Sequence, residues 1–374
     1  MSHPNLTGRR RALLALLAGS AVVAGLVPSG AASASVSSAA KKGTCPSNWK
    51  LTKPCIPAGQ PDVNKDGKVV IAILSPGDTN DNGYYESFII TARQFAKRNK
   101  WKLVITDKIP LANAAVSARN ACRQRPGMVA IAASELRDAI PVSAEPVCKG
   151  TVWYVAGGQG VNQTNYFFQT SDVVEESQYA TGVAAGEIMK AKGVTKAGFI
   201  TGPQLDFSVT AYKSFKAGIL SVVPGAQVVA TYTGSFDDAG LGNEAAKAQI
   251  SQGVGIIYPY LGGATDAVAS TAKQSNVQSV TPGTNRCADA DGRFAISSIF
   301  SPGDYFAAAL RDFEKKKVKL GVTRTFRLGK DPVPSVKVCS NVANASTVQA
   351  AVDKVVKEIA SGQIDPKAEV AKVS

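Results

Sequence analysis

The sequence predicts an α/β protein made of two Rossmann-like lobes, each with a parallel sheet, joined by a hinge. Continuous apolar runs, typical of parallel strands that are covered on both faces, recur along the chain. Amphipathic helical segments alternate with these runs, as in βαβ units. The 374 residues suffice for two lobes with full cores, and typical domain sizes favour two lobes over one sheet of about ten strands.

The first such unit organises the rest of the chain. Residues 69–74 (VVIAIL) predict a buried strand, and Phe88, Ala92, Phe95 and Ala96 have the spacing of one helix face. Ligands of open parallel sheets bind where loops leave the carboxyl ends of strands. The polar loop between the two elements, which contains Asn80 and Asp81, is therefore the first candidate binding segment, and a solvated turn is the alternative.

Later segments repeat the same pattern. We expect right-handed crossovers between successive strands, because parallel neighbours require them. Further strands are expected at residues 102–107, 128–132, 152–155, 166–170, 197–201, 227–233, 255–260 and 278–282, and helices at 112–123, 174–192, 209–222, 241–252 and 264–274.

The first 34 residues have the features of a secretory signal peptide. Three arginines (residues 9–11) precede an apolar run, and Ala32-Ser33-Ala34 offers a cleavage site. The run is too short and too interrupted to span a membrane, and no cysteine directly follows it. We expect an exported, soluble protein without a lipid anchor, located outside the cell, on its surface or in the periplasm. Residues 35–67 are expected to form a linker with a cysteine-stapled lead-in.

The cysteine and histidine content limits the kinds of catalytic and metal site that the chain can contain. Six cysteines suit an oxidising compartment and allow several connectivities, of which we expect neighbours to pair: Cys45 with Cys55, Cys122 with Cys148, and Cys287 with Cys339. The single histidine, His3, lies in the leader. Histidine-dependent triads and most zinc sites are therefore excluded after the leader, and we expect no cofactor.

The formal net charge of +14 raises the question of an anionic partner. The basic residues are spread along the chain, and runs such as residues 315–317 lack interleaved aromatic residues, so we expect no nucleic-acid binding. Residues 157–160 (GGQG) lack the spacing of a dinucleotide-binding loop. Asp237 and Asp238 are adjacent, which is more typical of a solvated loop than of a metal site.

Five motifs, taken in order, resemble the basic membrane protein family, the nucleoside-binding type of substrate-binding protein in ABC importers. Their order and spacing match those of the family over residues 68–362. They are residues 81–86 (DNGYYE), 175–186 (EESQYATGVAAG), 196–202 with 215–218, 234–240 (GSFDDAG), and 253–257 with 262–264.

The resemblance implies a type I periplasmic-binding-protein fold without catalytic activity. We expect an N-terminal lobe of residues 68–171 plus 283–319 and a C-terminal lobe of residues 172–282 plus 320–374. The family's better-known ligands are purine nucleosides, whose base stacks between aromatic rings while carboxylates and a lysine bind the ribose.

When the family's binding residues are carried over to this sequence by position, some of them match and others do not. Asp81 fits the acid of the first loop and Tyr84 the aromatic residue, but Tyr85 stands where the family has Asn. Asn285 replaces an Asp, and Ser301 replaces a Lys. Because two charged ribose contacts are missing, a nucleoside is expected but a different small polar ligand remains open.

The second lobe is expected to contribute Asp206, Phe207, Tyr260 and Gly263. Asp206 and Phe207 follow a strand and would form a polar or aromatic wall, although a helix cap is the alternative for Asp206. Tyr260 ends a strand and could stack on a base, and Gly263 belongs to one of the motifs. We expect Tyr258 and Trp153 in the core.

These features indicate an extracytoplasmic receptor that captures a small polar ligand and delivers it to an ABC permease. We expect a monomer and no enzyme. The alternatives are a sugar or other-solute receptor, a sensor subunit that docks a signalling protein, and a hydrolase that uses Asp81 with Asp304 as a carboxylate pair.

Overall fold

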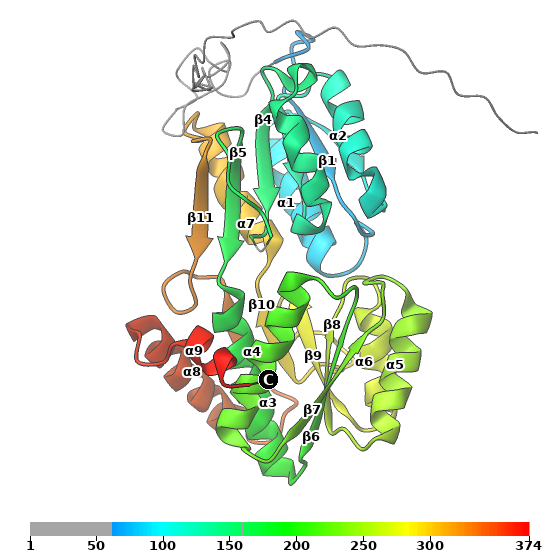
Figure 1. Cartoon of the computed structure of the whole chain (residues 1–374), viewed down its shortest axis with the longest axis vertical. Coiled ribbons are helices and arrows are strands. Elements are labelled where there is room, and N and C mark those ends of the chain that lie inside the picture. Colours follow the sequence, from blue (N-terminus) through cyan, green and yellow to red (C-terminus); the bar gives the residue numbers. More distant parts are fainter. Residues whose placement is uncertain (1–61, 159, 374) are drawn as a thin grey trace, which may run out of the picture. The chain divides into compact units, whose positions relative to one another are not determined.

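The computed structural model describes residues 62–158 and 160–373, which contain two six-stranded sheets (Figure 1). The first sheet has the order β11-β5-β4-β3-β1-β2 and the second the order β12-β10-β9-β8-β6-β7. We call each sheet with its covering helices a lobe. The strands are β1 (Val70–Leu74), β2 (Lys102–Thr106), β3 (Met128–Ile131), β4 (Val152–Ala156), β5 (Phe167–Asp172), β6 (Lys196–Thr201), β7 (Gln227–Tyr232), β8 (Ile256–Tyr260), β9 (Gln278–Gly283), β10 (Ile296–Ile299), β11 (Val322–Phe326) and β12 (Ser335–Val338).

Helices alternate with most of these strands. The α-helices are α1 (Tyr84–Asn99), α2 (Ala114–Arg123), α3 (Val174–Lys192), α4 (Asp206–Val222), α5 (Ala239–Ser251), α6 (Thr265–Gln274), α7 (Pro302–Glu314), α8 (Ala345–Ser361) and α9 (Pro366–Ala371). Short 3-10 segments are η1 (Leu111–Asn113), η2 (Ser134–Ala144) and η3 (Pro146–Cys148). The α/β fold class predicted from the sequence is confirmed.

The first sheet is covered on both faces, which explains the unbroken apolar runs of its inner strands. All five residues of β1 are buried. On one face, α1 and α7 pack together, with the rings of Phe88 and Phe306 stacked 3.9 Å apart. On the other face, α2 and η2 pack over Trp153, which is fully buried as expected. Burial on both faces is the usual state of a parallel sheet.

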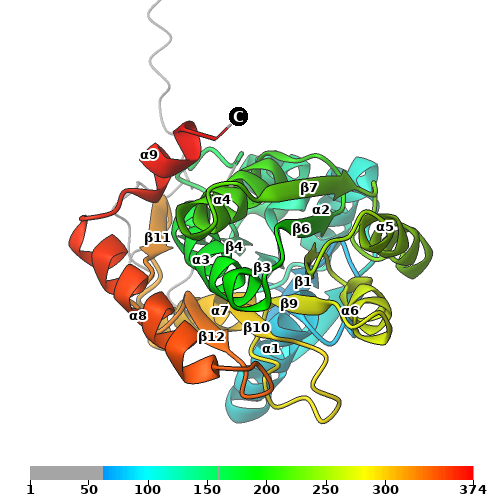
Figure 2. The ribbon, with the colours of Figure 1, turned by 90° about the horizontal axis from the view of Figure 1, so that it is seen from below.

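The second sheet is built in the same way. Figure 2 shows α3 and α4 on one side of it and α5 and α6 on the other. Tyr258 is fully buried in the core beneath α3 and α4, as the sequence predicts. Each lobe therefore has its own core on both faces of its sheet.

The chain passes between the two sheets at three places, and two of them differ from the expected lobe boundaries. It leaves the first sheet after β5, close to the expected position. It stays in the second sheet through β10, beyond the expected return at Gly283, because β10 pairs with β9. It then pairs β11 with β5 in the first sheet, and β12 joins β10 in the second as the one antiparallel pair among the described strands.

Two of the expected disulfides are confirmed: Cys122–Cys148 and Cys287–Cys339. The first joins α2 to η3, and the second joins the loop after β9 to the residue after β12. Cys45 and Cys55, the leader and most of the linker lie outside the described residues. Among the described helices, none has the length and apolar character needed to cross a bilayer.

In the second lobe, helices α3 and α4 cross at two glycines, where their backbones lie in close contact. A methyl carbon at Gly182 would lie 2.2 Å from the carbonyl oxygen of Phe215, and one at Gly218 would lie 2.1 Å from that of Tyr179. Both contacts are with backbone, which cannot move aside like a flexible side chain. The two helices therefore approach each other only because neither residue has a side chain.

We predict that Gly218→Ala lowers the free energy of unfolding by roughly 1–3 kcal/mol, since the added methyl forces α3 and α4 apart. Urea unfolding of the purified protein measures this change. Gly225→Ala is the matched control, because no atom lies within 4 Å of a methyl carbon there. Equal stability of the two variants would contradict the close helix crossing.

Candidate functional site

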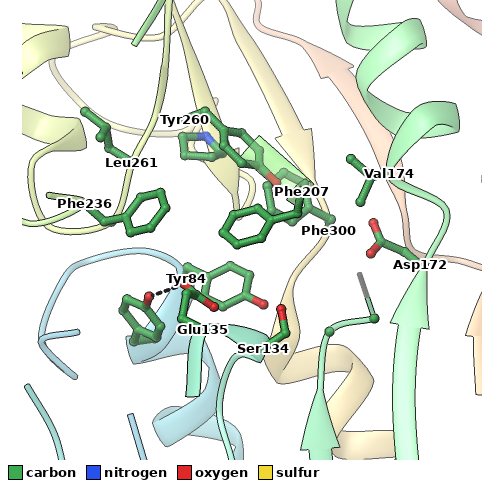
Figure 3. Close-up of a pocket in the computed structure, with 15 residues that line it drawn as sticks. Tyr84, Ser134, Glu135, Asp172, Val174, Phe207, Phe236, Tyr260, Leu261 and Phe300 are labelled. Carbon is green, nitrogen blue, oxygen red and sulfur yellow. Dashed lines mark hydrogen bonds between the residues drawn. The ribbon is translucent and has the colours of Figure 1, made fainter. Parts of the chain in front are cut away.

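A cavity of about 750 Å³, part of it open to solvent, lies between the two lobes (Figure 3). Residues of both sheets and of their loops line it. They are Tyr84, Tyr85, Ser134, Glu135, Gly157, Gly158, Asp172, Val174, Phe207, Phe236, Tyr260, Leu261, Gly262, Pro282 and Phe300. We call this space the central cavity.

The parallel strands explain why these residues converge. Glu135 follows β3, and Asp172 is the last residue of β5. In the second lobe, Tyr260 ends β8, Phe236 follows β7, and Phe300 follows β10. The carboxyl ends of both sheets therefore open toward one space, which is where open α/β sheets bind ligands.

Aromatic rings form most of the cavity wall. In Figure 3 the ring of Tyr84 lies across the cavity from those of Phe207 and Phe236. The rings of Phe207 and Phe236 are stacked, with centroids 5.9 Å apart. The ring centroid of Phe300 lies 6.2 Å from that of Tyr84 and 5.7 Å from that of Tyr260. Phe300 therefore lies between an aromatic ring of the first lobe and one of the second. Such walls suit a flat, partly apolar ligand.

Glu135 is held in the cavity wall by a tyrosine. The hydroxyl of Tyr85 donates a hydrogen bond of 2.9 Å to its Oε1. Burial raises the pKa of the Glu135 carboxyl above its usual range. Removal from water is costly for a carboxylate that has only a neutral donor beside it, so its proton is held more tightly.

Asp172 is the second acid of the central cavity. Burial raises the pKa of its carboxyl to about 7, and the nearby charges of Glu175 and Glu176 add to the effect. Its neighbour Glu176 is compensated differently, because it accepts hydrogen bonds from the side chain of Arg327 and the backbone N–H of Leu328. Among the described residues, no other residue donates a hydrogen bond to Asp172.

Asp81 has a structural task at the start of α1. Its carboxylate accepts hydrogen bonds from the backbone N–H groups of Gly83, Tyr85 and Glu86, at 2.9 to 3.1 Å. These are donors that a helix start leaves unpaired. Burial nevertheless raises the pKa of Asp81 to about 6, although the three bonds alone would lower it. The carboxylate faces a neighbouring cavity, not the central one.

The neighbouring cavity also contains Asn80 and Gly263. The side chain of Asn80 is exposed and bonds to Asp78, while the backbone N–H of Gly263 donates to Asp237 at 2.7 Å. Asp238 caps α5 by accepting from Gly240 and Leu241, so this acid pair is bonded to backbone groups. No group of acids suited to a metal occurs in the described part of the chain.

Two polar contacts connect the lobes beside the cavities. Asp206, the first residue of α4, makes no cap bond and instead lies 3.8 Å from Arg137 of the first lobe. Asn82 of the first lobe donates to Asp266 of the second at 3.3 Å. Both contacts join residues of the first lobe to residues of the second.

The two residues that replace charged family positions lie away from the central cavity. Asn285 is exposed, and its Oδ1 accepts from the backbone N–H of Cys287. Ser301 is buried and caps α7 by accepting from the N–H of Asp304. Asp304 itself is exposed and does not line the central cavity, so it forms no carboxylate pair with Asp81 there.

Of the candidate binding residues, four line the central cavity: Tyr84, Tyr85, Phe207 and Tyr260. Sequence reasoning did not select the acids Glu135 and Asp172 or the rings of Phe236 and Phe300. Each of these residues stands at or just after the carboxyl end of a strand, and that position was the available signal.

A family of known proteins matches most of the chain. The family model described as ABC transporter substrate-binding protein PnrA-like (Bmp) covers residues 68–369. The chain belongs to this family. The family resemblance expected from the motifs is thereby confirmed.

A curated relative matches part of this Bmp-family chain. Over 101 residues this chain is 40% identical to that relative, the ABC transporter nucleoside-binding protein BmpA of Lactococcus lactis subsp. cremoris (strain MG1363). That match covers 27% of this chain and 28% of the relative, well under two thirds of its length.

Solved structures share the fold. An ABC transporter solute-binding protein from Aeropyrum pernix K1 aligns with a TM-score of 0.68 at 15% identity, covering 79% of this chain and 92% of the other. One from Conexibacter woesei DSM 14684 aligns with a TM-score of 0.60 at 20% identity, covering 79% and 98%. At such identities the likeness concerns the fold alone.

We predict that Asp81→Ala lowers the free energy of unfolding by about 1 kcal/mol, because three N–H groups at the start of α1 lose their acceptor. Asp81→Asn, which keeps one acceptor oxygen, should lose less. Urea unfolding separates the two variants. A larger loss for Asn than for Ala would contradict the capping role.

Asp172 should make stability depend on pH. The folded protein keeps the Asp172 proton at pH values where the unfolded chain has lost it, so this group destabilises the fold as pH rises from about 4 to about 7. We expect Asp172→Asn to be roughly 1–3 kcal/mol more stable than the wild type at about pH 8 and equally stable at about pH 4.

Urea unfolding at both pH values measures this difference. Asp138→Asn, which removes an exposed acid of η2, serves as the control and should change little at either pH. A gain for Asp172→Asn that is the same at both pH values would show that the carboxyl titrates normally.

Proposed function

We propose that this protein captures a small polar solute, a nucleoside in the first place, in the central cavity and delivers it to an ABC permease in the membrane. The observation that carries the proposal is the cavity itself. It lies where the strand ends of two lobes face each other, and six aromatic rings and two carboxylates line it. Membership of the Bmp family supports the same role.

The wall chemistry suits a nucleoside. A base can stack on the rings of Tyr84, Phe207 or Tyr260, and ring stacking contributes affinity beyond buried area. Ribose hydroxyls are donors, and Glu135 and Asp172 are acceptors at the same cavity. The partly matching relative that is called a nucleoside-binding protein supports this choice of ligand.

The arrangement also suits a clamp. Three chain passages join the lobes, so a hinge motion can open the cleft without breaking either sheet. The contacts of Arg137 with Asp206 and of Asn82 with Asp266 then form or break as the lobes approach or separate. We further propose that the protein is exported by its leader and acts as a monomer.

A thermal-shift screen with nucleosides, bases and simple sugars tests the proposal. A ligand present at about 100 times its dissociation constant stabilises the fold by about 2.7 kcal/mol. The compound with the largest shift is then titrated calorimetrically against the wild type and two tryptophan variants.

We predict that Val174→Trp weakens binding of that compound at least about tenfold, because the indole fills the central cavity that Val174 lines. Val116→Trp is the matched control: Val116 is 53% exposed on α2 and lies outside the cavity. Unchanged affinity in Val174→Trp would place the binding site elsewhere and contradict the proposal.

A further inference from the structure

The central cavity has an unusual charge balance. Among its lining residues there are two carboxylates, Glu135 and Asp172, and no lysine, arginine or histidine. This contrasts with the whole chain, whose formal net charge is +14. The rest of the wall is dominated by the rings of Tyr84, Tyr85, Phe207, Phe236, Tyr260 and Phe300.

The acids of the neighbouring cavity already have partners in the protein. Asp78 forms an ion pair with Lys108 at 2.9 Å, and Asp266 forms one with Arg286. Asp81 accepts three backbone hydrogen bonds, and Asp237 accepts one from Gly263. Two of the four acids thus have a cationic partner, and the other two are bound by backbone N–H groups.

Glu135 and Asp172 lack such balance. Glu135 accepts a hydrogen bond from the neutral hydroxyl of Tyr85. The charge of Arg137 lowers the pKa of Glu135, but less than burial raises it, and the ion pair of Arg137 is with Asp206. No cationic side chain in the described part of the chain forms an ion pair with Asp172. Burial raises the pKa of both carboxyls, which is the expected consequence of an acid without a counter-ion.

We propose that the ligand of the central cavity is a planar ring that carries a positive charge, such as a quaternised or protonated heterocycle. This inference rests on the proposed solute-binding function and narrows the class of solute. A cation is attracted to the faces of aromatic rings, most strongly where water is excluded. It would also act as the counter-ion for the two partly buried carboxylates.

Other ligand classes fit this charge balance less well. An anionic ligand would add to the negative charge of a partly enclosed site whose two acids have no ion-pair partner among the described residues. A neutral ring can stack, but it leaves the two carboxylates to be satisfied by hydroxyl donors alone. The positive charge is therefore the feature that the site can select.

Two pairs of probes isolate that charge. 1-Methylnicotinamide is a planar cation, and 3-methylbenzamide has the same shape without the charge. 1-Methyladenosine is cationic near neutral pH, and its isomer N6-methyladenosine is neutral. Calorimetric titration of the full chain at low salt, near pH 7, gives the four dissociation constants.

The cationic member of each pair is expected to bind at least about tenfold more tightly than its neutral partner. The preference should fall to less than about threefold when Asp172→Asn and Glu135→Gln are combined. The control Asp138→Asn removes an exposed acid from η2, the segment that also contains Glu135, and should keep the preference. Retained binding of the neutral probe by the double variant shows that its cavity is intact.

Equal or tighter binding of the neutral members would overturn the inference, as would a preference that persists unchanged in the double variant. If only neutral nucleosides bind, the charge inference fails while the proposed solute-binding function stands. If no probe and no compound of the thermal-shift panel binds, both fail together.

Discussion

Burial of two parallel sheets on both faces is the constraint on which the structure depends. A parallel strand must be followed by a crossover, so every loop that leaves a carboxyl end emerges at the same edge of its sheet. Here both sheets turn that edge toward the central cavity, which is why residues from β3, β5, β8 and β10 or their following loops meet there. The sheet topology therefore determines where the site lies, and the side chains determine its chemistry.

The central cavity contains groups that lower the stability of the fold. Glu135 and Asp172 are partly buried without an ion-pair partner in the part of the chain that the structure describes, and the rings of Phe207 and Phe236, which are only partly buried, line the central cavity. Both features cost free energy of folding. The well-packed regions lie elsewhere, as at the α3–α4 crossing.

The sequence allows much of the fold to be predicted, because residues such as 69–74 are apolar without interruption. Strands β10, β11 and β12 escaped prediction because polar residues interrupt their apolar pattern, and β11 and β12 are edge strands. Missing them shifted the expected lobe boundaries after Gly283. Short edge pairing is decided by the neighbouring strand, which a local pattern does not contain.

The site was predictable where motifs place aromatic residues, as with Tyr84 and Tyr260. Asp81 and Ser301 have residue types that suit both ligand binding and helix capping, and only the structure shows the capping bonds. Asp172 ends a strand, as many polar residues do. Its significance comes from its place in the wall of the central cavity, which residues of both lobes form and which a local sequence pattern does not contain.

Hydrogen-exchange mass spectrometry with and without the best ligand of the thermal-shift screen tests the central claim most directly. If the lobes close on the ligand, amides of residues 133–136 and of residues 260–262, which line the central cavity from the two lobes, gain protection together, although they belong to different sheets. Protection confined to one lobe, or found on an outer helix such as α2, would contradict binding between the lobes.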